Sequence, residues 1–160
     1  MVISSVLRGG RRKVIGVVAV LLSAMLLMGL APMRSGADER YGRRMQMLSL
    51  TNQDRRMHDR EALDFAARVS QYAKDHSRAM ANRGYLYHSS EEQLRKALEG
   101  SNWTIGGENV GVGASLESLE DAFMASKLHR ENILRPTYDN AAIGVVRADG
   151  RIWVTVIFYG

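Results

Sequence analysis

Hydrophobic positions in the first half of the sequence recur at helical spacing. Met45, Leu48 and Met57 lie near intervals of three to four residues and predict one helix. Between residues 60 and 84, a stripe of apolar and small side chains predicts a second helix. Its members are Leu63, Ala66, Val69, Ala73, Ser77 and Met80. Gly84 stands where a helix commonly ends in a left-handed residue.

Two more helices are expected in the middle of the chain. Ser89 or Ser90 can cap a short helix over residues 91–99. A longer helix is predicted over residues 115–134, and Pro136 ends it. Its apolar positions are Leu116, Leu119, Phe123, Met124 and Leu128.

The last third of the chain changes from helical to extended patterning. Four glycines within residues 106–113 predict either a tight turn or a close backbone approach. Residues 142–146 and 152–158 read as two strands joined by the turn Asp149-Gly150. The second strand is almost entirely apolar, so it should be central and covered on both faces. Together these elements predict an α/β protein, a three-layer α/β/α sandwich with a small antiparallel sheet.

The N-terminus has the layout of an export signal. An uncharged run over residues 14–33 is long enough to span a membrane, and a positive region before it also suits a secretory signal peptide. Small residues up to Ala37 offer a cleavage site. Residues 1–37 are therefore predicted to be a signal peptide or an uncleaved membrane anchor, and either one places the domain outside the cytoplasm. Residues 38–44 are expected to be a polar linker, and residues 45–160 the folded domain.

Charge and cysteine content narrow the function classes. Of the 22 Lys and Arg residues, five precede Asp38, whereas all 17 acidic residues lie from Asp38 onward, so this part has a net charge of zero. The net charge of +5 therefore belongs to the leader and is not a nucleic-acid footprint. With no cysteine, the chain has neither a disulfide framework nor a thiolate zinc site.

Five short motifs follow one another in the domain. In this order and at this spacing they resemble the bacterial branch of the CAP superfamily, named for cysteine-rich secretory protein, antigen 5 and pathogenesis-related proteins. The resemblance extends over residues 45–160. The motifs are Ala73-Lys74-Asp75-His76-Ser77-Arg78-Ala79-Met80, the aromatic-preceded His88, Gly107-Glu108-Asn109, His129-Arg130-Glu131-Asn132-Ile133-Leu134 and Ile143-Gly144-Val145.

The resemblance implies a surface cleft on an α/β/α sandwich. Two histidines and a glutamate converge in such a cleft, and they correspond here to His88, His129 and Glu108. Asn109 and Ser126 are expected beside them. The two histidines are also the expected ligands of a metal, for which zinc is the candidate.

The chain departs from the family pattern just before His129. Phe123 stands in place of a common tryptophan, and Ser126 stands where many members have a second glutamate. Lys127-Leu128 replaces a Pro-Gly pair and places a cation beside the cleft. These changes weaken a four-ligand metal site.

The leading functional interpretation is non-catalytic. It is an exported binding module that presents the His/Glu cleft to a small amphipathic ligand, such as a lipid, or to an extracellular protein or cell-wall partner. This function requires no cofactor, and membrane contact would come through the N-terminal segment alone. The alternative is a metal-dependent hydrolase acting on peptide or cell-wall material, with Glu108 as general base between His88 and His129. A third hypothesis is a purely structural polar cluster.

Other side chains near these motifs have simpler interpretations. His76 is expected to be bonded or packed within its helix, and His58 to lie at the surface. Several aromatic residues could line a groove for a ligand, or could be core and rim residues. They are Tyr85, Tyr87, Trp103, Phe123 and Tyr138.

Overall fold

A mainly antiparallel sheet lies at the centre of residues 36–160, the part of the chain that the computed structural model describes. Its four strands lie in the order β1-β3-β4-β2, and β4 pairs antiparallel with both β3 and β2. The two-residue β1 runs parallel to β3. The strands are β1 (Asp64–Phe65), β2 (Gly106–Gly113), β3 (Asn140–Ala148) and β4 (Arg151–Tyr159). The apolar C-terminal strand is thus central, as its sequence predicts.

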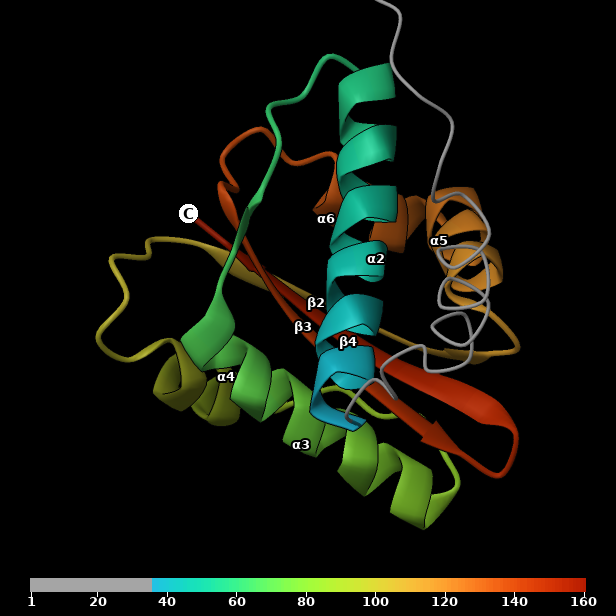
Figure 1. Ribbon diagram of the computed structural model, residues 1–160. Coiled ribbons are helices and arrows are strands. Elements are labelled where there is room, and N and C mark those ends of the chain that lie inside the picture. Colours follow the sequence, from blue (N-terminus) through green and yellow to red (C-terminus); the bar gives the residue numbers. More distant parts are fainter. Residues whose placement is uncertain (1–35) are drawn as a thin grey trace, which may run out of the picture. The chain divides into compact units, whose positions relative to one another are not determined.

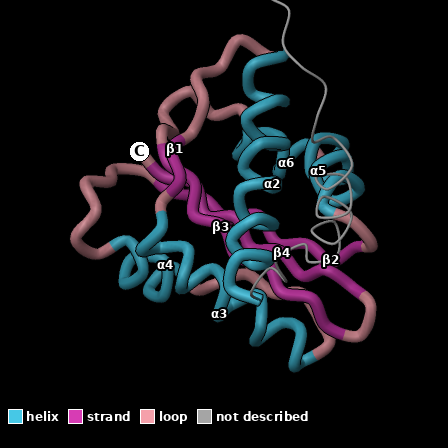
Figure 2. The backbone as a smooth tube through the Cα atoms, in the orientation of Figure 1, coloured by secondary structure: helices cyan, strands magenta, loops and turns pink. Residues whose placement is uncertain are grey.

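Helices cover both faces of the sheet (Figure 1, Figure 2). Val154, Val156 and Phe158 of β4 pack in a core shared with α2, α5 and α6, whereas Trp153 and Ile157 pack toward α3 and α4. The predicted α/β/α sandwich is therefore confirmed. The helices are α2 (Gly36–Met57), α3 (Ala67–Arg83), α4 (Glu91–Leu98), α5 (Leu116–Ala125) and α6 (Lys127–Ile133).

Most of the predicted leader, residues 1–37, lies outside the described residues. Residues 38–44, which the sequence predicts as a polar linker, are helical and form the beginning of α2. Glu39 lies in the first turn, where a carboxylate favours the helix, and pairs with Arg43 one turn later. No helix between residues 36 and 160 is both long and apolar enough to cross a lipid bilayer.

The long helix predicted over residues 115–134 is divided into α5 and α6 at Ser126. Ser126 has an extended backbone, with φ −85° and ψ 123°. Arg130 bridges the break, because its Nη1 donates to the carbonyl oxygen of Met124 at 2.7 Å. The break turns α6 so that the Ser126 hydroxyl lies 2.9 Å from Nδ1 of His129.

The glycine-rich segment is a strand, and of the two alternatives predicted for its glycines the structure shows the close backbone approach. A Cβ atom at Gly111 would lie 2.9 Å from the ring of Phe123. A Cβ atom at Gly113 would lie 2.9 Å from Leu119. The glycines of β2 thus allow α5 to pack closely on this edge of the sheet.

Predicted turn and cap residues have their expected conformations. Asp149 and Gly150 have positive φ angles of 48° and 73° and join β3 to β4, as a two-residue hairpin turn requires. Gly84 ends α3 in the left-handed region at φ 75°. Ser90 caps α4 through a reciprocal capping box with Gln93.

Arg55, near the end of α2, is fully buried, and its hydrogen bonds to the described residues all go to backbone carbonyl oxygens. Its guanidinium donates to carbonyl oxygens in the loop after α2, at the end of α6 and in the segment before β3. The acceptors are Glu61 (2.6 Å), Ile133 (2.6 Å), Arg135 (3.1 Å) and Tyr138 (3.0 Å). One side chain therefore fastens three segments together.

We expect Arg55→Met to lower the free energy of unfolding by about 3 kcal/mol or more, because it leaves buried carbonyl groups without donors. Arg56→Met is the matched control, since Arg56 is the exposed neighbour and should change stability by less than about 0.5 kcal/mol. Urea unfolding monitored by circular dichroism measures both. Equal stability of the two variants would contradict the role assigned to Arg55.

Glu120 of α5 is a buried carboxyl group against α2. It is 3% exposed, and neither carboxyl oxygen lies within hydrogen-bonding distance and geometry of a partner. Burial is the main cause that raises the pKa of Glu120, and the nearby charge of Asp54 adds to it; against the opposing effect of the Thr51 hydroxyl, the pKa reaches about 8. The group is therefore mainly protonated at neutral pH.

This raised pKa makes stability pH-dependent. Between the unfolded value of 4.5 and about 8, the folded state holds more protons than the unfolded state. The free energy of unfolding should therefore fall as pH rises through this window, with a slope approaching about 1.4 kcal/mol per pH unit from this group. Glu120→Gln should remove that slope, whereas Asp121→Asn, at an exposed neighbour whose charge is the smallest contribution to the raised pKa, should retain most of it. Parallel pH profiles of wild type and Glu120→Gln would contradict the assignment.

Candidate functional site

The candidate site lies at the edge strand β2, which pairs with β4 alone. Neighbouring side chains of a strand point to opposite faces. Glu108 accordingly faces the side of α3 and α4, and Asn109 faces the side of α6. His88 lies just before α4, and His129 lies in α6. The strand thus connects one histidine in each outer layer.

Glu108 is held by a dense set of hydrogen bonds, and its side chain is only 3% exposed. Its Oε1 accepts from the Ser89 backbone N–H at 2.9 Å and faces His88 Nδ1 at 2.9 Å. Its Oε2 accepts from the Ser89 hydroxyl at 2.7 Å. Tyr72 donates to that hydroxyl oxygen at 2.9 Å. The carboxylate thus ties the segment before α4 to the edge of the sheet.

His88 is the exposed member of the site, with 58% of its side chain accessible. A carboxylate accepts hydrogen bonds, so the nitrogen facing Glu108 is the donor, Nδ1–H. The neutral imidazole then presents Nε2 as an acceptor. Among the described residues, no hydrogen-bond partner occupies that Nε2.

His129 is half-buried against Phe123, with ring centroids 5.2 Å apart. Its Nδ1 lies 2.9 Å from the Ser126 hydroxyl. The Asn109 side chain donates to the His129 carbonyl oxygen at 3.1 Å and accepts from Asn132 at 2.9 Å. Burial lowers the pKa of His129, and the charge of nearby His88 lowers it further.

The structure thus brings the residues predicted for the cleft into one network of neighbours. They are His88, Glu108, Asn109, Ser126 and His129. Ser126, at the position where many family members have glutamate, supports His129. Lys127 projects into solvent with its side chain 80% exposed, 4.0 Å from Glu131.

The other two histidines lie outside this network. His76 is buried and bonds the Tyr87 carbonyl oxygen at 2.9 Å, as expected for a packed helix residue. His58 is exposed and bonds the Asp54 carbonyl oxygen at 2.8 Å. Both have the simpler role that the sequence suggests.

The donor set does not fit the three-ligand zinc site. Zinc in an open site takes three protein ligands, and His88 and His129 supply two. Glu108 is the natural third, but both of its oxygens already accept hydrogen bonds from Ser89 or His88. Between residues 36 and 160, no cluster of three His, Cys, Asp or Glu side chains is arranged to hold a metal ion. Glu108 instead orients His88.

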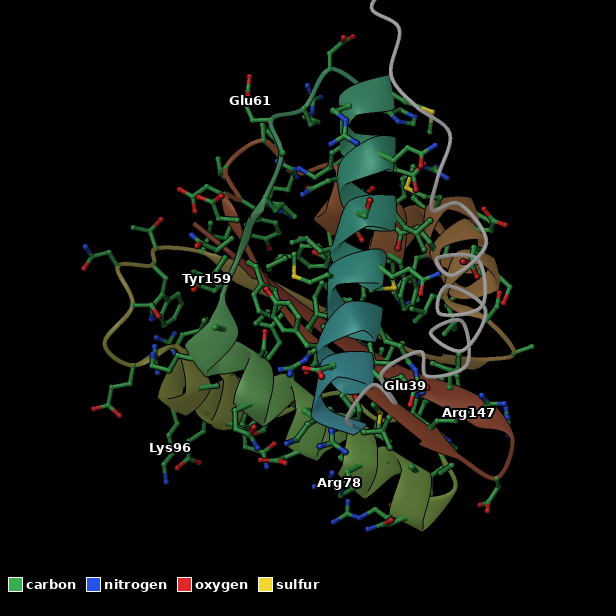
Figure 3. All side chains as sticks on the ribbon, viewed as in Figure 1. Glu39, Glu61, Arg78, Lys96, Arg147 and Tyr159 are labelled. Carbon is green, nitrogen blue, oxygen red and sulfur yellow. The ribbon has the colours of Figure 1, made fainter. Side chains whose placement is uncertain are left out.

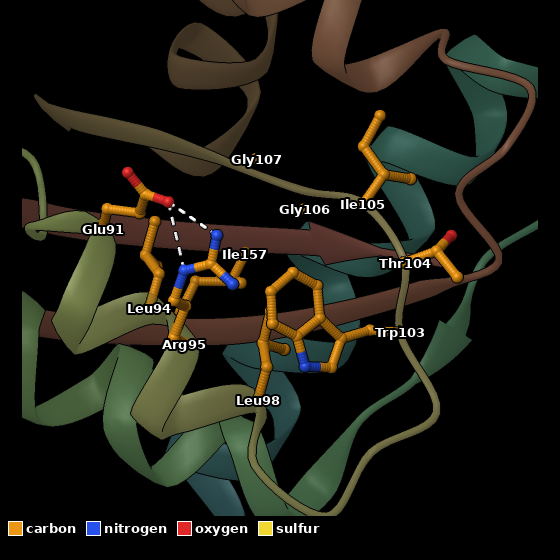
Figure 4. A pocket seen from close by; sticks show the side chains of 10 residues that line it. All are labelled: Glu91, Leu94, Arg95, Leu98, Trp103, Thr104, Ile105, Gly106, Gly107 and Ile157. Carbon is orange, nitrogen blue, oxygen red and sulfur yellow. Dashed lines mark hydrogen bonds and ion pairs between the residues drawn. The ribbon is translucent and has the colours of Figure 1, made fainter.

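A mainly apolar pocket reaches Gly107, the residue before Glu108 in β2, and Trp103 lines it (Figure 4). The cavity measures about 320 Å³ and lies between α4, the loop before β2 and β4. Two lining residues connect the pocket with Glu108 along the chain. Gly107 directly precedes Glu108 in β2, and Glu91 lies two positions after Ser89, the hydrogen-bond partner of Glu108. The lining residues are Glu91, Leu94, Arg95, Leu98, Trp103, Thr104, Ile105, Gly106, Gly107 and Ile157.

Sequence reasoning identified Trp103 as a possible groove residue but missed its partners on α4. Leu94 and Leu98 are one turn apart, and this spacing was the available signal. The remaining aromatic candidates have other roles. Phe123 and Tyr138 are core residues, whereas Tyr85 is exposed and packs beside Tyr87.

Fold and site together define a class: an α/β/α sandwich in which two histidines flank a glutamate on an edge strand. The sequence model of the cysteine-rich secretory protein family, CAP, matches residues 48–158. The chain therefore belongs to the CAP family.

Individual relatives agree with this assignment. The uncharacterized protein YkwD of Bacillus subtilis is 29% identical over 114 residues, covering 68% of this chain and 44% of that protein. An extracellular protein with an SCP domain from Bacillus anthracis superposes with a TM-score of 0.66 at 23% identity, covering 81% of this chain and 45% of its own. An outer surface protein of Borrelia burgdorferi superposes with a TM-score of 0.64 at 14% identity, covering 72% of this chain and 90% of its own. The chain thus spans less than half of the length of each of the first two relatives.

The proximity of the two histidines predicts a measurable coupling. The pKa of His129 should lie below its ordinary value of 6.5 and should rise in His88→Gln, where the neighbouring charge is absent. NMR titration of the imidazole protons measures it, and His58→Gln serves as the distant control. An unchanged His129 titration in His88→Gln would show that the two rings are not close enough to interact.

Proposed function

We propose that this protein is an exported, non-catalytic binding module whose His/Glu cleft receives a small amphipathic ligand. The observation that carries the proposal is the state of Glu108, which is buried and already bonded to Ser89 and His88. A general base needs a carboxylate oxygen within reach of a water or substrate proton. Here the carboxylate instead positions the histidine that meets the ligand.

The chemistry of the ligand follows from what lies around Glu108. The Nε2 atoms of His88 and His129 have no hydrogen-bond partner among the described residues and can hydrogen-bond a polar head. The pocket next to Glu108 along the chain offers Trp103, Leu94 and Leu98 to an apolar chain. Ligand sites commonly combine an apolar cavity with a few convergent polar groups. A medium-chain carboxylic acid has this two-part form.

The location outside the cytoplasm rests on two supports. One is the basic and then apolar order of residues 1–37. The other is that similar structures include an extracellular SCP-domain protein and an outer surface protein. The domain is accordingly either secreted or held at the outer side of a membrane by its N-terminal segment.

Binding of decanoate tests the proposal through the fluorescence of Trp103. Residues 35–160 form a separate compact unit and suit the titration. We expect a saturable change in emission, and about tenfold weaker binding in Leu94→Gln, which makes the pocket polar. Leu128→Gln is the matched control, because Leu128 is 73% exposed and outside the pocket. Equal affinities of the two variants, or no saturable change, would reject the amphipathic ligand.

The metal-dependent hydrolase remains the competing function, and zinc separates the two. Bound zinc would stabilise the fold by about 2.7 kcal/mol at a hundredfold excess over Kd. Thermal unfolding with and without Zn²⁺ should show no such rise if the cleft binds an amphipathic ligand alone. A rise that is lost in both His88→Ala and His129→Ala would favour the hydrolase. Lower stability in both variants, without a zinc or decanoate effect, would favour a structural cluster.

A further inference from the structure

A second cavity, of about 340 Å³, lies at the opposite side of the sheet, along β3. Beyond Ala141, β3 pairs with β4 alone, and the beginning of α2 and the middle of α3 flank it. Five basic side chains line this cavity together with Glu39, and we call it the basic groove. They are Arg40 and Arg43 of α2, Lys74 and Arg78 of α3, and Arg147 of β3.

Charge is concentrated in the basic groove. Arg43 pairs with Glu39, and Arg78 lies 3.7 Å from Asp75. The remaining three groove cations, Arg40, Lys74 and Arg147, form no ion pair with an acidic side chain in residues 36–160. Figure 3 shows Arg78 and Arg147 near Glu39, at the end of the domain where α2 begins.

This excess is local. The chain from Asp38 onward contains 17 basic and 17 acidic residues, so its net charge is zero. The three excess cations of the groove therefore reflect where the fold places basic side chains, and not an excess of basic residues in the domain. Guanidinium groups match phosphate oxygens in a bidentate geometry, and a lysine adds a point charge. The partner should be an anion that carries phosphate.

We propose that the basic groove binds the phosphate headgroups of an anionic lipid surface. Gly36, which lines the groove, follows Met33, the last residue of the uncharged run, by three positions. The groove is thus at the end of the domain that the apolar segment joins. Basic residues next to a membrane segment are attracted to anionic headgroups. The domain itself then contacts the membrane, beyond the contact expected of the N-terminal segment.

The test measures co-sedimentation of residues 35–160 with vesicles, which removes the contribution of the apolar segment. Vesicles of phosphatidylglycerol with phosphatidylcholine are compared with phosphatidylcholine alone, at low and at high salt. The groove variant carries Arg40→Gln, Lys74→Gln and Arg147→Gln. The matched control carries Arg56→Gln, Lys96→Gln and Lys127→Gln, which removes equal charge from exposed sites outside the groove.

We expect salt-sensitive binding to the anionic vesicles alone, lost by a factor on the order of a hundred in the groove variant and largely retained in the control. If both variants lose the same amount of vesicle binding, the binding depends on the total charge of the domain and not on the groove, which overturns the proposal. Absence of binding to anionic vesicles would also overturn it. Soluble poly(glycerol phosphate) is the last arm, and tighter binding to it than to vesicles would assign the groove to an anionic polymer instead.

Discussion

The buried guanidinium of Arg55 is the contact on which the arrangement of the site depends. It donates hydrogen bonds to carbonyl oxygens at the end of α6 and in the segment that leads to β3. Through Ile133 it fixes the end of the short helix that carries His129, and through Tyr138 it fixes a side chain that lies against Gly107. A helix as short as α6 has little stability of its own in water. Its position is therefore imposed by a residue of α2 and not by its own sequence.

Strand β2 then places the polar side chains of the site on both faces of the sheet, toward its two helical layers. Glu108 and Asn109 are adjacent, so the pleat sends their side chains to opposite faces. Glu108 binds the segment before α4, whereas Asn109 bonds the backbone of α6 and the side chain of Asn132. Both are almost fully buried and both have hydrogen-bond partners. The buried pair thus acts as framework, and in the proposed function the more accessible imidazoles of His88 and His129 meet the ligand.

The sequence was informative wherever a local pattern decides the conformation. Hydrophobic spacing identified the helices and the central strand, and Asp149-Gly150 identified the hairpin. The features that the sequence did not predict depend on long-range contacts. The break at Ser126 depends on Arg130 reaching Met124, and the glycines of β2 make room for Phe123 and Leu119, which no local pattern reveals. The convergence of His88 and His129, which are 41 positions apart, came from family resemblance alone. The environments of Arg55 and Glu120 were not predicted, because burial of a charged residue depends on the packing of several segments.

The two open edges of the sheet have opposite chemistry, and this bears on how the domain is oriented. At β2 the polar groups are satisfied within the protein, and a mainly apolar pocket lies beside them. At β3, three cations remain without an acidic partner among residues 36–160, next to the point where the N-terminal segment joins the domain. A domain that turned its β3 edge toward anionic headgroups would face the β2 edge away from them, because β4 separates the two strands. The His88 and Glu108 site would then face the solvent. The two proposed roles, headgroup binding at one edge and ligand binding at the other, are therefore compatible within one sheet.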